Sequence, residues 1–445
     1  MSEPTLGVEG RSDRAGAPAP AAGRSPVGTS PVGTLARHGR LPKHTGPRTA
    51  AKFAASALAV LLVSGGAIAA WAVADLAGSV KPGVELESEK VLENVPDIGA
   101  MEGGLNFLLV GSDKRPATGA FGDPEEESAV LNDVTMVVHI SQDHSHVEVV
   151  SFPRDLLVEV PECPDPDDPA NPYSARSGVK INTILGDGGF NCIARTVESM
   201  LGITIPVGGI VEFDGVAALS EAVGGVEVCV VDAIDDAYTG LKLEPGTHSL
   251  KGYDALAFLR TRHGVGDGSD LGRIASQQSF LASLARTVQS AGTLADPVRL
   301  YSIAKAILAN MTLSSGMQDA GRLISVARAM QAIDLDKIAF IQYPTVYTDD
   351  FSAVLPAESG AVVAAALQKD VPVVFDPNAT GNASYGTVGQ DPTPPADAPA
   401  PTDPAATDPA ATPAPTTPAP VAEALPGDVT GQTAQEVRCA AANTE

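Results

Sequence analysis

The sequence predicts an α/β protein with a mixed central β-sheet flanked by helices, preceded by a single transmembrane helix. Short runs of nearly continuous aliphatic residues, such as VTMVVHI and VEVVSF, alternate with longer stretches of helical periodicity. Strands that are apolar on both faces need helices on both sides of the sheet. An uncharged run of 22 residues, Phe53–Ala74, predicts the transmembrane helix.

This uncharged run has the length of a membrane span. At about 1.5 Å per residue it is about 33 Å long, enough to cross a hydrocarbon core of about 30 Å. A cleaved signal peptide usually has a shorter leading segment and a shorter apolar region, and a core helix of this length usually carries a polar stripe. We therefore expect a retained anchor.

The charge distribution predicts the orientation of that anchor. Residues 1–52 contain eight Lys/Arg and three acidic residues, whereas the whole chain has a formal net charge of −25. The positive-inside rule keeps the basic flank in the cytoplasm, so we expect a single-pass type II protein of the cell membrane with an extracellular main domain. The acidic remainder argues against a nucleic-acid partner, because phosphate binding along a nucleic acid needs a basic face.

The chain divides into five predicted segments. Residues 1–52 form a disordered basic cytoplasmic tail, 53–74 the transmembrane helix, 75–104 an extracellular stalk, 105–376 a globular domain and 377–445 a Pro/Ala/Thr-rich extracellular tail. Residues 391–426 hold 12 of the 36 prolines, so we expect no packed core there.

Strand-like and helix-like runs alternate within the globular domain. Strands are predicted at Asn106–Val110, Val134–Ile140, Val147–Phe152, Gly209–Phe213, Val226–Val231 and Ile338–Tyr343. Helices are predicted at Cys192–Leu201, Gly215–Val223, Tyr253–Thr261, Ile274–Gln289, Pro297–Leu308, Met317–Ala332 and Ser359–Leu367. The polar connection SQDHSH joins two of the strands and predicts a hairpin.

The four cysteines fit an exported domain, and their spacing contains no CxxC pair that would indicate a zinc site. Cys163 precedes a Pro/Asp-rich loop and Cys192 begins a predicted helix. A bridge between them closes a ring of about 30 residues, worth roughly 3–4 kcal/mol in the chain-entropy model. The residues alone leave open whether Cys229 and Cys439 pair.

The acidic main domain carries one group of cations at the ends of predicted elements: Arg154, Lys180, Arg260, Arg262, His263 and Arg273. Arg262 and Arg273 flank the segment HGVGDGSDLG, residues 263–272, which we call the glycine-rich loop. Arginines at element ends beside a flexible loop are suited to grip phosphate through bidentate hydrogen bonds. Each of them alone is equally compatible with a surface ion pair.

Two carboxylates complement these cations. Asp113 follows a predicted strand in VGSDKR, and Asp133 precedes the next strand in LNDVTM. If the two strands are antiparallel neighbours, both carboxylates lie at one sheet edge, where they could form a Mg²⁺ site together with phosphate oxygens and water. Either residue alone could instead form a turn or cap a helix.

At these residues the sequence resembles the LytR-CpsA-Psr family, in its actinobacterial form. Seven stretches carry the resemblance, in family order over about residues 105–285: NFLLVGSDKR, NDVTMVVHIS, VEVVSFPRDLLVEVP, KINTILGDGG, ARTVESMLGI, VEFDGVAALSEAVGGVEV and ALAFLRTRHGVGDGSDLGRIASQQSFL. The predicted anchor and acidic stalk also agree with it.

The resemblance implies a phosphotransferase that moves an anionic glycopolymer from a polyprenyl-pyrophosphate carrier to peptidoglycan. It implies that Mg²⁺, with Mn²⁺ as the alternative, is held by Asp113 and Asp133. It implies that the pyrophosphate is gripped by Arg154, Lys180, Arg260, Arg262 and Arg273, with Gln277 assisting. Asp270 would orient Arg273, and Arg115 is a further candidate at the mouth of the site.

Phosphoryl transfer needs positioning and charge neutralisation more than a covalent nucleophile, which agrees with this residue set. The incoming sugar hydroxyl needs a proton acceptor, for which Asp155, Asp113 and Asp133 are candidates. A polyprenyl tail needs an apolar slot, which we expect between the sheet and the helices that follow Arg273.

The sequence departs from its relatives at three points. Leu131 stands where many relatives carry Arg, and Ser276 where a basic residue is frequent, so phosphate contacts are not expected from these two positions. Relatives often have a cysteine in the turn that here reads LEPGTHSLKG. We therefore hypothesise that Cys439 replaces it as the partner of Cys229.

Two other functions fit the same residues. A polyprenyl-pyrophosphate hydrolase would use water as the acceptor, and a non-enzymatic cell-wall-binding or regulatory protein would need no turnover at the arginines. The donor glycan cannot be read from these residues.

Overall fold

The computed structural model describes residues 46–94, 104–114, 130–165, 168, 170–266, 268–290, 296–376, 379 and 421–443. The described residues divide into two units between Gly65 and Gly66. The predicted cytoplasmic tail up to residue 45, part of the stalk and the proline-rich segment 380–420 lie outside the described residues.

Helix α1 (Gly46–Gly78) contains the predicted transmembrane segment and is long and apolar enough to cross a membrane. It carries no acidic residue in its first turn, and its first charged residue after Lys52 is Asp75. The 3-10 helix η1 (Glu87–Asn94) follows in the predicted stalk. Part of this stalk packs on the domain, because Val84 bonds to the backbone of Leu313 and Leu86 is buried.

Seven strands of the described chain form the central sheet, in the order β11-β6-β1-β2-β3-β12-β17. Their bounds are Met311–Leu313 (β11), Val207–Val211 (β6), Leu105–Ser112 (β1), Asn132–Ile140 (β2), Val147–Phe152 (β3), Ile338–Gln342 (β12) and Gly431–Thr433 (β17). β1, β2 and β3 are antiparallel neighbours, whereas β6 runs parallel to β1 and β12 parallel to β3. The sheet is therefore mixed, and the predicted hairpin through SQDHSH is confirmed.

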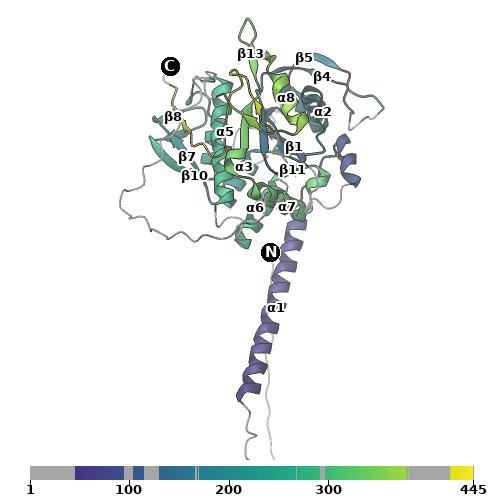
Figure 1. The fold of residues 1–445 in the computed structure, drawn as a ribbon, viewed down its shortest axis with the longest axis vertical. Helices are drawn as coiled ribbons and strands as arrows, with labels where there is room; N and C mark the ends of the chain where they lie inside the picture. The colour runs from purple at the N-terminus through teal and green to yellow at the C-terminus, as the bar shows by residue number, and fades with distance from the viewer. Residues whose placement is uncertain are drawn as a thin grey trace, which may run out of the picture. The chain divides into compact units, whose positions relative to one another are not determined.

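Helices cover both faces of this sheet (Figure 1). Their bounds are Ile184–Leu201 (α2), Phe213–Ala222 (α3), Gly252–Arg260 (α4), Asp270–Gln289 (α5), Pro297–Asn310 (α6), Ala320–Ala332 (α7) and Gly360–Lys369 (α8). Leu108 of β1 joins the apolar core under α2 and α8, whereas Leu105 joins the core under α5 and α6. This alternation along β1 is why its sequence reads as a continuous apolar run.

A three-stranded sheet of β10 (Gly246–Leu250), β7 (Val226–Val230) and β18 (Cys439–Ala440) packs with α4 and α5 around a third core. Four two-stranded ladders complete the described fold: β4 (Leu157–Val160) with β5 (Arg176–Lys180), β8 (Ile234–Asp236) with β9 (Leu241–Leu243), β13 (Thr345–Tyr347) with β14 (Val354–Pro356), and β15 (Val373–Val374) with β16 (Glu423–Ala424). Short 3-10 turns lie at Ile181–Thr183 (η3), Ser315–Met317 (η4) and Leu335–Lys337 (η5).

Several predicted elements have different bounds in the structure. The helix predicted from Cys192 begins at Ile184, and the helix predicted from Ile274 begins at Asp270. The strand predicted at Gly209–Phe213 ends at Val211, because Phe213 already begins α3 after the extended residue Glu212. The helix predicted from Met317 begins at Ala320, where Asp319 caps it by accepting a bond from the backbone of Arg322.

The domain extends beyond its predicted end at Asp376. Residues 421–443 return to it, bury Leu425, Val429 and Ala434, and add β17 to the central sheet. The chain therefore needs this segment to complete its core.

Two disulfides cross-link the fold. The predicted bridge Cys163–Cys192 is present, with a Cα–Cα distance of 5.2 Å. Cys229 of β7 bonds to Cys439 of β18, as hypothesised, with a Cα–Cα distance of 4.4 Å. The second bridge ties the C-terminal segment to the second sheet.

Candidate functional site

The two predicted metal carboxylates lie at one edge of the central sheet. In the antiparallel register of β1 and β2, Ser112 is opposite Asn132, with an irregularity after Gly111. Asp113 leaves this edge immediately after β1, and Asp133 lies at the start of β2. The pairing assumed from the sequence is therefore correct, and it places the two residues on adjoining strands.

Asp113 is bonded to the chain that enters β2. Its Oδ1 accepts a hydrogen bond of 2.7 Å from the backbone N–H of Leu131, and its own N–H donates to the carbonyl of Leu131 at 3.1 Å. These bonds fix the start of β2 beside the end of β1. The backbone of Leu131 therefore holds the side chain of Asp113 in place.

Asp133 lies between two arginines. Its Oδ1 accepts a bond of 2.8 Å from Nη1 of Arg154, which follows β3. Nη1 of Arg273 lies 3.8 Å from its Oδ2, and Nη2 of Arg273 donates to its backbone oxygen at 2.8 Å. Because β2 and β3 are neighbours, one carboxylate holds cations from β3 and α5 at the same edge.

Asp270 holds the same two arginines from the N-terminus of α5. Its Oδ1 is 2.7 Å from Nη2 of Arg273, and its Oδ2 accepts a bond of 3.2 Å from the backbone N–H of Arg154. Ser269 caps the helix by accepting a bond from Gly272. The side chain of Arg273 is only 5% exposed, so these carboxylates keep its guanidinium in one position.

Lys180 pairs with Asp155 at the same edge. Its Nζ donates to Asp155 at 2.8 Å and to the carbonyl of Ser352 at 2.9 Å, and Arg154 Nε lies 3.5 Å from the other carboxylate oxygen. Burial alone would raise the pKa of Asp155, but the Lys180 hydrogen bond and the two positive charges outweigh it and hold the pKa below its usual value. Asp155 is therefore ionised at neutral pH.

The charges of the carboxylates also act on Arg154. Burial alone would lower its pKa, but Asp133, Asp270 and Asp155 together raise the pKa above the ordinary value. Arg154 is thus a permanently charged side chain whose positive charge is largely compensated inside the protein.

Arg262 differs from Arg154 and Arg273 in having no ion-pair partner in the described chain. It follows α4 and is half-buried, and no carboxylate of the described chain lies within ion-pair distance of it. Burial and the nearby charges of Arg154 and Arg273 lower its pKa, and the attraction of Asp270 and Asp133 does not outweigh them. A half-buried cation beside two other cations is an arrangement that an anionic ligand would stabilise.

An apolar cavity of about 160 Å³ lies between the central sheet and helices α3, α4 and α5. Its polar side is formed by Ser112, Asp133, Glu212, Ser220, Arg260, Arg273 and Gln277. Aliphatic and aromatic side chains line the remainder: Leu109, Val134, Met136, Val211, Phe213, Val216, Leu219, Val226, Leu256, Leu259, Phe280, Leu281, Leu284 and Met311. The expected apolar slot is therefore present, although α3 and α4 line it as well as α5.

Two predicted residues are held by the wall of this cavity. The guanidinium of Arg260 lies over the ring of Phe213, 4.3 Å from its centroid. Gln277 Nε2 donates to the carbonyl of Leu259 at 3.1 Å. His263, which was predicted to belong to the group of cations, instead stacks on Tyr238, with ring centroids 4.4 Å apart. Arg115 lies outside the described residues.

The glycine-rich loop, which joins Arg262 to Arg273, has a contact that the sequence did not reveal. Its Gly266 N–H donates to the carbonyl of Ala441 at 2.9 Å, and the N–H of Asn443 donates to Gly264 at 3.2 Å. The C-terminal segment therefore holds this loop by backbone bonds. The only signal for it in the sequence is Cys439, which anchors the segment two residues earlier.

Residues 79–367 match the model of the LytR_cpsA_psr family. The chain belongs to the LytR_cpsA_psr family. The matched range includes every candidate site residue named above, whereas the C-terminal segment 421–443 lies outside it. The fold, with its mixed sheet between helices, agrees with this family.

Several relatives have been described. The cell wall biosynthesis protein LcpA of Corynebacterium glutamicum is 30% identical over 318 residues, which cover 65% of this chain and 58% of LcpA. TagT of Bacillus subtilis, a polyisoprenyl-teichoic acid–peptidoglycan teichoic acid transferase, is 24% identical over 66% of this chain and 86% of TagT. The chain spans between half and two thirds of the length of LcpA and about half that of LcpB from the same organism.

Solved structures of the family are also similar. A LytR-Csp2A-Psr enzyme from Actinomyces oris is 23% identical and covers 65% of this chain and 96% of its own, with a TM-score of 0.48. TagT bound to LIIa-WTA is 20% identical and covers 64% of this chain and 98% of its own, with a TM-score of 0.47.

Proposed function

We propose that this LytR_cpsA_psr family protein is a membrane-anchored phosphotransferase that moves an anionic glycopolymer from a polyprenyl-pyrophosphate carrier to peptidoglycan. The observation that carries the proposal is the half-buried Arg262, which has no ion-pair partner in the described chain, close to Arg273, whose side chain lines the apolar cavity. A ligand with a phosphate head and an apolar tail satisfies both features at once. TagT, a polyisoprenyl-teichoic acid–peptidoglycan teichoic acid transferase, supports the same donor and acceptor classes.

The donor would bind through its two chemically distinct ends. The pyrophosphate would accept hydrogen bonds from Arg154, Arg260, Arg262, Arg273 and Lys180, and the first part of the lipid would enter the apolar cavity. Burial of apolar surface contributes about 25 cal/mol per Å², so the lipid adds affinity that a soluble sugar phosphate lacks. Gln277 would fix the wall between the two regions, because it bonds to Leu259.

The proposed Mg²⁺, with Mn²⁺ as the alternative, would be held by Asp113 and Asp133. The described chain has no group of three or more His, Cys, Asp or Glu placed for a metal ion. Two carboxylates completed by phosphate oxygens and water are nevertheless a common Mg²⁺ environment, and Asp133 already faces the arginines that would bind the phosphates. When bound, the ion would neutralise phosphate charge during the transfer.

The reaction itself would be a phosphoryl transfer. The oxygen of the acceptor hydroxyl forms a bond to the phosphorus that carries the glycan, and the bond from that phosphorus to the lipid phosphate breaks. The products are a phosphodiester-linked glycan and a polyprenyl monophosphate. The arginines stabilise the charge that develops on the departing phosphate.

The hydroxyl proton needs an acceptor at the same edge. Asp155 is ionised and is held by Lys180 beside Arg154, so it is the first candidate. Asp113 and Asp133 are the alternatives, and both would be less basic when a metal ion is bound. Substituting each Asp with Asn and comparing the pH dependence of the rate separates the three.

A product assay distinguishes the proposal from its rivals. Purified full-length protein in lipid vesicles receives a labelled polyprenyl-pyrophosphate-linked glycan, Mg²⁺ and peptidoglycan. Label on the wall through a phosphodiester supports the transferase. Labelled glycan phosphate released into water, with none on the wall, supports the hydrolase. Tight donor binding without either product supports a binding or regulatory protein.

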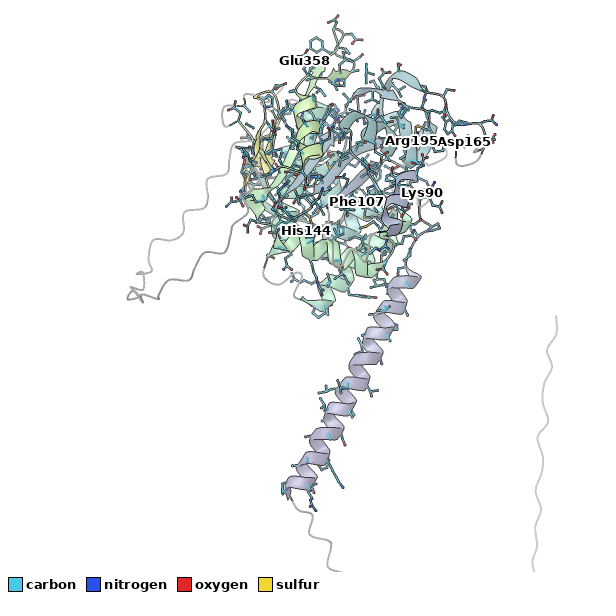
Figure 2. The ribbon with its side chains drawn as sticks, turned by 45° about the vertical axis from the view of Figure 1, so that its right-hand side comes forward. Lys90, Phe107, His144, Asp165, Arg195 and Glu358 are labelled. Carbon is cyan, nitrogen blue, oxygen red and sulfur yellow. A yellow bond between two sulfur atoms is a disulfide. The ribbon has the colours of Figure 1, made fainter. Side chains whose placement is uncertain are left out.

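Arg262→Ala and Arg195→Ala form a matched pair of variants for this assay. Arg195 of α2 pairs with Glu87 at 2.9 Å and lies near the loop that carries Asp165 (Figure 2). We expect the first variant to lose transfer and the second to retain it. Equal transfer by both would reject the proposed site.

A further inference from the structure

The end of α1 is attached to α6 through a compact set of side chains, which we call the α1–α6 junction: Trp71, Asp75, Tyr301 and Lys305. The rings of Trp71 and Tyr301 lie 6.2 Å apart between centroids. Asp75 accepts hydrogen bonds from the Tyr301 hydroxyl and from Lys305 Nζ, the latter at 2.7 Å. The junction lies within the second compact unit, residues 66–445.

The order of these contacts gives the relative direction of the two helices. Trp71 and Asp75 are one turn apart on α1, and Tyr301 and Lys305 are one turn apart on α6. Tyr301 contacts both Trp71 and Asp75, whereas Lys305 donates to Asp75. The turn of α6 that precedes Tyr301 therefore lies on the Trp71 side of the junction.

Val298 lies three residues before Tyr301, about 4.5 Å further along α6 in that direction. Val298 is 71% exposed, so its apolar side chain is free to enter another phase. Arg299 beside it has an exposed guanidinium, 3.8 Å from Asp296.

From this geometry we propose that the first turn of α6 is a second membrane contact, in which Val298 enters the lipid interface and Arg299 and Lys305 face the phosphate headgroups. The proposal rests on the proposed membrane insertion of α1. The occupant is a lipid surface because an inserted α1 carries the bilayer to the level of Trp71, and Tyr301 is bonded at that level. Aromatic rings at the boundary, with a cation and an apolar side chain beside them, form the usual composition of an interfacial segment.

The contact would fix the height of the domain above the membrane. The residue that follows α6, Met311, lines the apolar cavity, and α6 packs under α3, which forms another wall of it. A shallowly inserted α6 would hold this cavity close to the lipid from which its proposed ligand comes. The membrane contact would also explain why two hydrogen-bond donors, Tyr301 and Lys305, face Asp75, since the negative charge of a carboxylate at the interface needs compensation.

Site-specific labelling of the full chain tests the proposal. All four cysteines form disulfides, so Val298→Cys gives a single thiol for the environment-sensitive fluorophore NBD. Val346→Cys on β13 is the matched control, because Val346 is 52% exposed and its hairpin, with Glu358 shortly after it, lies at the opposite end of the domain (Figures 1 and 2). Both proteins are reconstituted into vesicles of three parts phosphatidylcholine and one part phosphatidylglycerol.

We expect the label at position 298 to shift its emission to the blue and to lose most of its intensity when the vesicles contain lipids with a nitroxide near the headgroup. The label at position 346 should be unaffected. Equal quenching at both positions, or a label at 298 that is shielded from water but not quenched by the lipid nitroxide, would overturn the proposal; the second result would indicate another copy of the chain or another protein on this surface.

The same samples report on the anchor separately. Trp71 is the only tryptophan, so brominated lipids that quench its fluorescence report on the insertion of α1. Quenching of Trp71 without quenching at 298 would overturn the α6 contact and leave the anchor intact. No quenching of Trp71 would overturn both.

Discussion

Arg262 and Arg273 lie in the same site, yet only the replacement of Arg273 should destabilise the fold. Arg273 is nearly buried and is paired with Asp270 and Asp133, whereas Arg262 has no carboxylate partner in the described chain. Arg262→Ala therefore removes a cation that the folded protein does not need. Arg273→Ala removes a cation that is paired with the carboxylates of Asp270 and Asp133.

The magnitudes follow from these environments. Removing one partner of a buried ion pair costs about 3–5 kcal/mol of folding free energy, which we expect for Arg273→Ala. Arg262→Ala should change the folding free energy by less than about 0.5 kcal/mol, or stabilise the fold slightly by relieving repulsion with Arg154 and Arg273. If Arg262 stabilises charge in the transition state, its loss should reduce kcat/KM by about 100- to 1,000-fold.

Two measurements on each variant test this reasoning. Thermal unfolding gives the stability, and initial rates with the lipid-linked donor give kcat/KM, with Arg195→Ala as a surface control whose exposed pair with Glu87 contributes at most about 1 kcal/mol. A destabilised Arg262→Ala, or one whose lost activity matches its unfolded fraction, would refute the argument that this side chain is reserved for a ligand. An Arg273→Ala variant that is as stable as the unchanged protein would refute the prediction that this arginine stabilises the fold.

Three further predictions concern other parts of the molecule. Replacing both Cys229 and Cys439 with Ser opens a bridge of sequence separation 210, worth about 5 kcal/mol in the chain-entropy model, so unfolding should occur at lower denaturant and amide exchange in the glycine-rich loop should accelerate. Burial alone would lower the pKa of His146, but its bonds of 2.9 and 3.0 Å with Glu148 outweigh it and raise the pKa. The pair therefore stabilises the fold fully below about pH 6.5, and this contribution disappears as the pH rises through the raised pKa of His146. Glu148→Gln should lower the melting temperature at pH 6 far more than at pH 9. An equal loss at both pH values would contradict this direction. Removal of divalent ions with EDTA should reduce transfer and Mg²⁺ should restore it, while a rate that is indifferent to EDTA would remove the proposed metal.

The sequence was most informative where elements are long and repeat one pattern. The continuous apolar runs of β2 and β3 and the helical period of α5 predicted their elements closely, because burial on both faces of a sheet or on one face of a helix imposes a regular pattern. Strands of two or three residues, such as β17 and β18, show no such pattern. Their formation depends on a partner strand that is distant in the sequence, so local residues could not reveal them.

The sequence predicted which residues form the candidate site, but it did not predict which of them pair with one another. The placement of Asp113 and Asp133 at one edge followed from an antiparallel pairing that was assumed from the sequence and that the structure confirms. The sequence could not show that Arg154 and Arg273 have carboxylate partners whereas Arg262 has none in the described chain, because that depends on side-chain distances across β2, β3 and α5. The roles assigned to these residues stay predictions until the variants are measured.

The net charge of −25 has a consequence for how an anionic donor would reach the site. Exposed carboxylates repel an anionic polymer from a distance, but at physiological ionic strength this repulsion is screened beyond about 8 Å. The arginines therefore act only on a phosphate that is already close. We infer that capture would depend on the lipid end of the donor, which enters an apolar cavity that charge repulsion does not affect, and on delivery along the membrane. An acidic protein with one cationic pocket would then discriminate against free polyanions in solution, while it accepts the same phosphate when a lipid carries it.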